Sequence, residues 1–150
     1  MKQKIIELLK QDEGFRTHVY KDTMGIDTVG IGYNLEANPA HLSHDEIADI
    51  RANGIAEERA EELLAEEVEK TYQHLASDLD FFSALPEDAQ IVLVDMAYNM
   101  GVKGVEQFKT MLADAEQGDF EKAAQDGLNS RWAKQVHGRA TRLMALLAQA

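Results

Sequence analysis

The strongest constraint on the fold is an apolar run that has no polar side. Residues 91–94 read Ile-Val-Leu-Val, and Met96 and Ala97 follow. A helix that is apolar nearly all round has to be buried, because only a surrounding core can cover every side of it. Pro86 suits the first helical turn and Gly101 suits the C-terminal end. The sequence therefore predicts a central buried helix.

Apolar periodicity predicts most of the other elements. Helices are expected over residues 2–12, 43–52, 56–77, 105–116 and 120–128, and the last helices carry Trp132 and residues 139–147. The longest helix buries a stripe formed by Leu64, Val68, Tyr72 and Leu75. Ser43 and Glu46 have capping-box spacing, which marks the start of the second helix.

A glycine-rich stretch, about residues 15–35, predicts a small sheet. Gly25, Gly30 and Gly32 permit tight turns and close backbone approach. The pattern alone therefore indicates the α+β class, with a sheet-bearing lobe, a long connecting helix and a helical lobe. At 150 residues the chain suits one domain, and such a domain buries roughly 70% of its unfolded surface.

Composition narrows the possible partners and cofactors. The net charge is −12, and phosphate binding demands clustered bases, so nucleic acid is not expected as a partner. The chain has no cysteine, which suits synthesis in a reducing cytoplasm. Glu7 and Lys10 interrupt the first apolar run, so neither a signal sequence nor membrane insertion is expected. The histidines provide no convincing set of three metal ligands, and we predict no metal or cofactor.

One stretch near the N-terminus holds the side chains best suited to chemistry. Glu13 stands at a predicted helix end, and Asp22 and Thr28 follow on a predicted hairpin. This layout places one carboxyl opposite a carboxylate and a hydroxyl. Two carboxyls on either side of a sugar chain are what acid-assisted glycoside hydrolysis requires.

The same stretch resembles the phage lysozymes (endolysins) of the T-even type, glycoside hydrolase family 24. Residues 12–32 carry the strongest similarity. It continues in the family's order at Asn99-Met100-Gly101, at Gly104-Val105 with Phe108, at Ser130-Arg131-Trp132, and at Arg139-Ala140 with Arg142. The resemblance implies a two-lobed lysozyme-like fold: an N-terminal lobe of roughly 13–56, and a helical lobe of roughly 57–150 together with helix 1–12.

The resemblance also implies the catalytic roles. Glu13 is the expected general acid, Asp22 the base or electrostatic stabiliser, and Thr28 the residue that positions the attacking water. The family type inverts anomeric configuration, which corresponds to carboxyls ~6.5–9.5 Å apart rather than ~5–5.5 Å. Substrate contacts are expected at Gly32, Asn34, Tyr98, Asn99 and Arg139.

Three positions depart from the family's pattern. Tyr33 stands where the family usually has histidine, and we expect this change to affect stability rather than the reaction type. Met111 and Asp126 replace a sugar-contacting serine and asparagine, so those two roles are not carried over.

Each candidate also has a purely structural interpretation. Glu13 could pair with a base at its helix end, and Asp22 could bond its own backbone within a turn. Thr28 suits an ordinary strand position. Asn34 equally suits a turn at a strand end, and Tyr98 the rim of the core.

As a whole, the resemblance implies a phage endolysin. It would hydrolyse the β-1,4 bond between N-acetylmuramic acid and N-acetylglucosamine in bacterial peptidoglycan, as a monomer, and lyse the host cell. It would accumulate in the host cytoplasm and reach the wall through a holin pore. The alternative is a non-hydrolytic peptidoglycan-binding module on the same scaffold; the presence of all three catalytic side chains argues against it.

Overall fold

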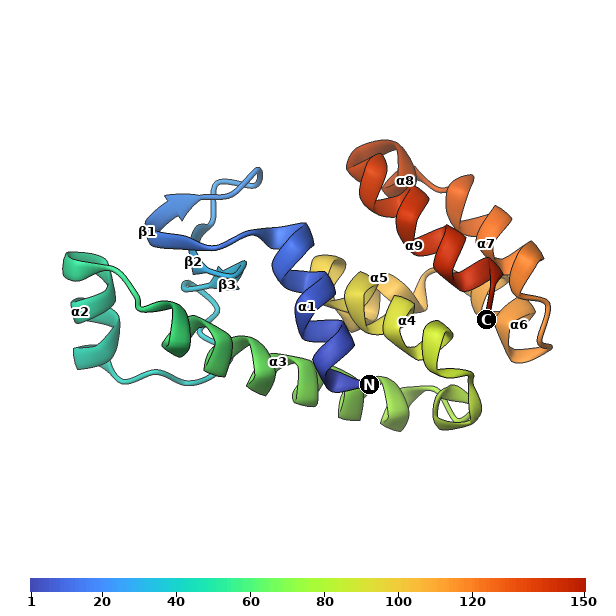
Figure 1. The fold of residues 1–150 in the computed structure, drawn as a ribbon, viewed down its shortest axis with the longest axis horizontal. Coiled ribbons are helices and arrows are strands. Elements are labelled where there is room, and N and C mark those ends of the chain that lie inside the picture. The colour runs from blue at the N-terminus through green and yellow to red at the C-terminus, as the bar shows by residue number, and fades with distance from the viewer. The chain divides into compact units, whose positions relative to one another are not determined.

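The computed structural model describes the whole chain, Met1–Ala150, as a mostly helical protein with one small sheet (Figure 1). The first elements are α1 (Lys2–Glu13), β1 (Arg16–Lys21), β2 (Asp27–Gly30), β3 (Tyr33–Asn34), α2 (His44–Asn53) and α3 (Glu57–Asp78). After a 3-10 turn at Phe82–Ala84 come α4 (Glu87–Met100), α5 (Val102–Glu106), α6 (Lys109–Glu116), α7 (Phe120–Leu128), α8 (Arg131–Val136) and α9 (Gly138–Ala148). The predicted α+β class and lysozyme-like fold are confirmed.

The chain divides into two compact units, and the boundary falls inside α3. Residues Lys2–Lys70 form the N-terminal unit and residues Thr71–Ala150 form the C-terminal unit. The lobe limits expected from the resemblance, including the assignment of the first helix to the helical lobe, stay a prediction. None of the helices combines the length and apolar character that crossing a membrane requires.

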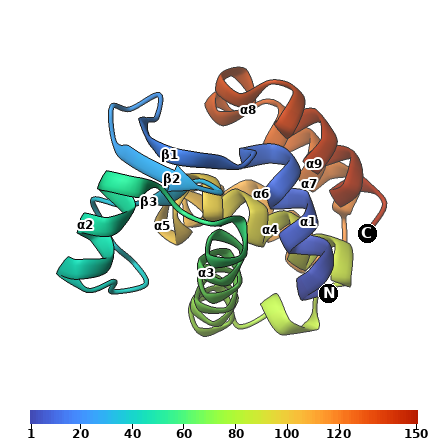
Figure 2. The ribbon, with the colours of Figure 1, turned by 60° about the vertical axis from the view of Figure 1, so that its left-hand side comes forward.

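The sheet of the N-terminal unit is antiparallel, with strand order β1-β2-β3 (Figure 2). Val29 pairs with Tyr33, and both side chains are buried on one face. The neighbouring position, Thr28, pairs with Tyr20 on β1 and with Asn34 on β3. Because directly opposite residues share a face, Tyr20, Thr28 and Asn34 form one row across the other face of the sheet. We call these three residues the sheet row.

The predicted cap of α2 is confirmed in one half only. The Ser43 hydroxyl accepts the backbone N–H of Glu46 at 3.1 Å, which satisfies one of the unpaired donors of the first turn. The Glu46 carboxylate does not complete the capping box. It instead binds Arg59 on α3, at 2.8 and 3.2 Å.

The C-terminal unit is built around α4, as its apolar pattern predicted. All residues from Ala89 to Ala97 are buried. Figure 1 shows α7 and α9 side by side, and Gly127 permits their close packing, since a Cβ there would lie 2.2 Å from the Met144 sulfur.

The single helix expected over 105–116 is wrong, because two short helices, α5 and α6, take its place. The interruption falls at Phe108, whose ψ of 58° lies outside the helical range. This departure accompanies an edge-on contact between the Phe108 and Trp132 rings, whose centroids are 6.1 Å apart. A tertiary contact therefore outweighs the local helical pattern.

A buried glutamine holds the turn before α4. Gln90 is 7% exposed, and its amide nitrogen donates to the carbonyls of Phe82, Ser83 and Leu85 at 3.1–3.2 Å. Its amide oxygen accepts the Tyr72 hydroxyl at 3.2 Å. One buried side chain thus donates to three backbone carbonyls around the 3-10 turn.

We expect Gln90→Leu to lower the free energy of unfolding by about 1–3 kcal/mol, because carbonyls that lose their buried donor pay the desolvation penalty. Urea unfolding measures the change. Gln125→Leu, on the exposed side of α7, is the matched control and should change stability by less than about 0.5 kcal/mol. Equal effects of the two substitutions would contradict the role given to Gln90.

Candidate active site

Glu13 is the last residue of α1, and its carboxyl rests against Gly32 in the N-terminal unit. Gly14, with φ of 70°, follows the helix and donates its N–H to the Lys10 carbonyl at 2.9 Å. A Cβ on Gly32 would lie 2.9 Å from Glu13 Oε2 and 3.0 Å from its carboxyl carbon. The carboxyl therefore touches backbone that only glycine leaves open. This contact gives Gly32 a positioning role, and its expected contact with substrate stays a prediction.

Asp22 closes the turn between β1 and β2. Its Oδ1 accepts the backbone N–H groups of Met24 at 2.8 Å and of Ile26 at 2.9 Å. Its backbone N–H donates to the Ile26 carbonyl, and its carbonyl accepts Gly25 N–H, both at 3.0 Å. Asp22 is thus the turn residue that its structural interpretation predicted. Since Oδ2 takes no part in these bonds, the turn also presents one carboxylate oxygen for other chemistry.

Thr28 lies at the centre of the sheet row and is 4% exposed. Its Oγ1 donates to the Ile26 carbonyl at 3.0 Å. The single hydroxyl hydrogen is therefore in use, and the oxygen can act towards a ligand or water only as an acceptor. Its neighbour in the row, Tyr20, was not predicted from sequence as a site residue, although residues 20 and 22 alternate onto one face of an extended strand.

Asn34, at the other end of the sheet row, has a turn role. Its Oδ1 accepts the Ala37 N–H at 2.9 Å, and its carbonyl accepts the Asn38 N–H at 3.0 Å. Contact with substrate through Nδ2 stays a prediction.

Tyr33 braces the loop after β3. Its hydroxyl donates to Asn38 Oδ1 at 2.7 Å and accepts the Ala40 N–H at 3.2 Å. Asn38 in turn bonds the backbone of Leu42. A hydrogen-bonded phenol therefore stands where the family's histidine would be.

In the C-terminal unit, Asn99 is oriented by an indole. Asn99 Oδ1 accepts the Trp132 Nε1–H at 2.8 Å. The amide NH2 consequently points away from the indole. Tyr98 precedes it on the last turn of α4 and is half-buried. The expected substrate contacts of Tyr98 and Asn99 stay predictions.

Arg139 forms a buried ion pair with Asp95. Its Nε and Nη2 lie 2.9 and 2.8 Å from Asp95 Oδ1, and the two side chains are 10% and 0% exposed. Asp95 was not predicted as a site residue, although a lone acidic residue inside an apolar helical run is a recognisable signal. The pair fixes the direction of the guanidinium, and the expected role of Arg139 towards substrate stays a prediction.

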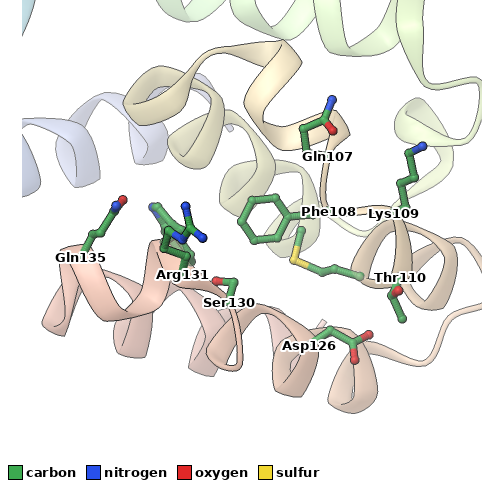
Figure 3. A pocket seen from close by; sticks show the side chains of 10 residues that line it. Gln107, Phe108, Lys109, Thr110, Asp126, Ser130, Arg131 and Gln135 are labelled. Atoms are coloured by element: carbon green, nitrogen blue, oxygen red, sulfur yellow. The ribbon is translucent and has the colours of Figure 1, made fainter.

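The C-terminal unit also holds a pocket of about 410 Å³ between α6, α7 and α8 (Figure 3). Phe108 projects into it, and Arg131 and Asp126 lie on different sides of the ring. Both positions that depart from the family's pattern in this unit line the pocket: Met111 and Asp126. Its volume falls in the range usual for small-ligand sites.

Asp126 is joined to a second carboxyl. The neighbouring Asp114 carboxyl raises the pKa of Asp126, and burial adds to the shift. Lys122, 3.7 Å from Asp114 Oδ1, opposes it. The cause is that like charges placed close together repel, which favours the protonated form of Asp126. The structure gathers no group of three acidic or histidine side chains that could hold a metal ion.

Similarity to known proteins identifies the family of this chain. The family model described as phage lysozyme matches residues 10–148. This chain belongs to the phage lysozyme family. It is 27% identical to a probable T4-type lysozyme of Dictyostelium discoideum, over 98% of this chain and 95% of that protein. A second such lysozyme from the same organism is also 27% identical, over 93% of this chain and 91% of that protein.

A longer relative is the pre-baseplate central spike protein Gp5 of Enterobacteria phage T4. It is 34% identical over 94% of this chain, but the match spans only 27% of the spike protein's length. Lysozymes are glycosidases that act on peptidoglycan, so membership of the family gives this chain a lysozyme-like glycosidase function.

We expect Gly32→Ala to lower kcat/KM about 100-fold, because the new methyl displaces the Glu13 carboxyl and misplacement of about 1 Å can cost that much. Gly118→Ala is the matched control: Gly118 has φ of 81°, close to the 66° of Gly32, but a Cβ there meets nothing within 4 Å. Both variants should lose about 1–2 kcal/mol of stability from the left-handed backbone. A similar loss of activity in both would contradict the contact.

We expect Asp126→Asn to stabilise the protein increasingly as the pH rises above 3.8, the ordinary Asp pKa. A carboxyl whose folded pKa is raised stabilises the fold while protonated and loses that contribution as it ionises. The variant has no such loss, so its gain in Tm over wild type should be larger at pH 7 than at pH 3.8. Calorimetry across this range tests it, with exposed Asp80→Asn as control; a gain independent of pH would contradict the raised pKa of Asp126.

Proposed function

We propose that this protein is a phage endolysin that hydrolyses the β-1,4 bond between N-acetylmuramic acid and N-acetylglucosamine. One observation carries the proposal: the N-terminal unit holds three oxygen-bearing side chains by different local contacts. The Glu13 carboxyl is held over Gly32, Asp22 keeps Oδ2 outside its turn, and the Thr28 hydroxyl can only accept. An acid, a base and a water-orienting acceptor are what inverting hydrolysis requires.

In the proposed reaction Glu13 donates its proton to the glycosidic oxygen as that bond breaks. Asp22 Oδ2 accepts a proton from the attacking water and stabilises the positive charge that develops on the sugar. Thr28 Oγ1 accepts a hydrogen bond from the same water, which orients a lone pair towards the anomeric carbon. The products are a new reducing end and a shortened glycan chain.

Tyr98, Asn99 and Arg139 are proposed sugar contacts of the C-terminal unit. The indole of Trp132 directs the Asn99 amide hydrogens away from itself, and Asp95 fixes the Arg139 guanidinium. Both arrangements prepare donors for sugar hydroxyls or acetamido carbonyls. We propose that the enzyme works as a monomer and without a cofactor.

Delivery to the wall is part of the proposal. The enzyme accumulates in the host cytoplasm and crosses to the peptidoglycan through a holin pore. Expression in a Gram-negative host without a holin should leave the cells intact until the inner membrane is permeabilised, and turbidity then falls. Lysis during expression alone would contradict this route.

We expect Glu13→Gln and Asp22→Asn each to lower the rate of lysis of outer-membrane-permeabilised Gram-negative cells by about 100-fold or more, since positioned acids and bases contribute that much. Loss of turbidity and release of reducing ends from purified peptidoglycan are the two measurements.

Glu58→Gln and Asp80→Asn are the matched controls, because both carboxyls are exposed and distant in sequence from the site. They should retain wild-type rates, and circular dichroism should give the same spectrum for all variants. Equal lysis by wild type and Glu13→Gln would move the acid elsewhere. Binding to peptidoglycan without any release of reducing ends would favour the non-hydrolytic module, and anhydro-sugar products would identify a transglycosylase.

A further inference from the structure

Tyr20 lies at one end of the sheet row, next to Thr28, and was not predicted from sequence as a site residue. It pairs directly with Thr28 across β1 and β2. Side chains paired in this way share a face, with Cβ atoms about 4.5–5.5 Å apart. Asp22 follows two residues later, where the chain leaves β1 for the turn. The register alone therefore puts the phenol beside two of the three proposed catalytic side chains.

Glu13 also lies within electrostatic range of this phenol. Burial raises the pKa of Tyr20, the negative charges of Glu13 and Asp22 raise it further, and Arg16 opposes them. Both carboxylates thus act on one hydroxyl. The phenol remains protonated at neutral pH, so it can donate a hydrogen bond.

The ring of Tyr20 has a contact partner on its own strand. The Arg16 guanidinium lies 4.4 Å from the ring centroid, in a cation–π contact. The strand between these two residues contains a register shift, a feature that re-aims side chains. Arg16 therefore contacts the face of the ring, and the hydroxyl at the edge of the ring is outside this contact.

That hydroxyl has no hydrogen-bond partner in the protein, and it keeps contact with solvent. Tyr33 provides the contrast within the same unit, because its hydroxyl is occupied by Asn38 and Ala40. A half-buried donor that lies near two carboxylates and lacks an internal acceptor is suited to a ligand oxygen.

We infer that Tyr20 is a substrate-binding residue, whose hydroxyl donates a hydrogen bond to an oxygen of the sugar held beside Glu13, Asp22 and Thr28. The oxygen is a ring hydroxyl or the carbonyl of an acetamido group, the two acceptors that an N-acetylated glycan offers. This inference rests on the proposed function for the class of substrate, and it adds a fourth residue to the site.

The test compares Tyr20→Phe with Tyr33→Phe in a Glu13→Gln background, where the glycan is bound but not cleaved. The probe is a purified N-acetylglucosamine–N-acetylmuramic acid oligosaccharide, and calorimetric titration gives Kd. Tyr20→Phe should raise Kd about three- to tenfold, the loss typical of one hydrogen bond, and leave Tm unchanged. Tyr33→Phe should lower Tm, because it breaks the brace to Asn38, and leave Kd unchanged.

The same substitutions in the otherwise wild-type enzyme give an independent readout. Tyr20→Phe should raise KM on labelled peptidoglycan by a similar factor with little change in kcat, as expected when a contact is made equally to bound substrate and transition state. An unchanged Kd and KM for Tyr20→Phe would overturn the inference, as would an equal rise in Kd for Tyr33→Phe. The proposed function fails separately, when Glu13→Gln still cleaves; the KM comparison in the otherwise wild-type enzyme then decides whether Tyr20 binds the glycan.

Discussion

The proposed active site depends on the absence of one side chain. Glu13 can rest against the backbone at Gly32 because no Cβ stands there, and φ of 66° at that residue further disfavours any substitute. The end of α1 and the connection between β2 and β3 meet here, and both limit where the Glu13 carboxyl can lie. The contact between Glu13 and Gly32 requires two features of the local sequence. The helix has to end at residue 13, and the hairpin has to be short enough to bring its backbone back to the Glu13 carboxyl.

The carboxylate of Asp22 combines a structural role in its turn with its proposed catalytic role. One oxygen is used twice by the backbone of its own turn, and the other is left outside it. The hydrogen bonds by which Asp22 stabilises its turn therefore also position its carboxylate. Thr28 is positioned in a similar way. Its hydroxyl hydrogen is donated to the Ile26 carbonyl, so its oxygen is left as an acceptor of fixed direction. Preorganised groups of this kind need no rearrangement during the reaction.

The sequence predicted the features that local pattern controls. The buried run of α4, the helix end at Glu13 and the Ser43 cap all depend on neighbours within one or two turns. Features that depend on distant partners were missed. The break between α5 and α6 accompanies the contact of Phe108 with Trp132, and Gln90 serves carbonyls of a different element. Tyr20 was overlooked because its importance comes from pairing with Thr28, and register cannot be read from one strand.

The C-terminal unit contains a buried ion pair and a pocket, and the two place different constraints on the sequence. Asp95 is a charged residue inside an apolar helix. Burying its charge costs desolvation free energy, which a well-oriented partner of opposite charge can offset. Arg139 supplies that partner through two nitrogens, which a lysine could not do in the same plane. Met111 and Asp126 line a pocket and depart from the family's pattern, whereas the acid, the base and the hydroxyl of the N-terminal unit follow it. A pocket can exchange its polar groups and still bind a related ligand, but a proton transfer fails when one oxygen is missing. Two of the three departures, Met111 and Asp126, therefore fall in a pocket, and none falls on the proposed acid, base or water-positioning residue.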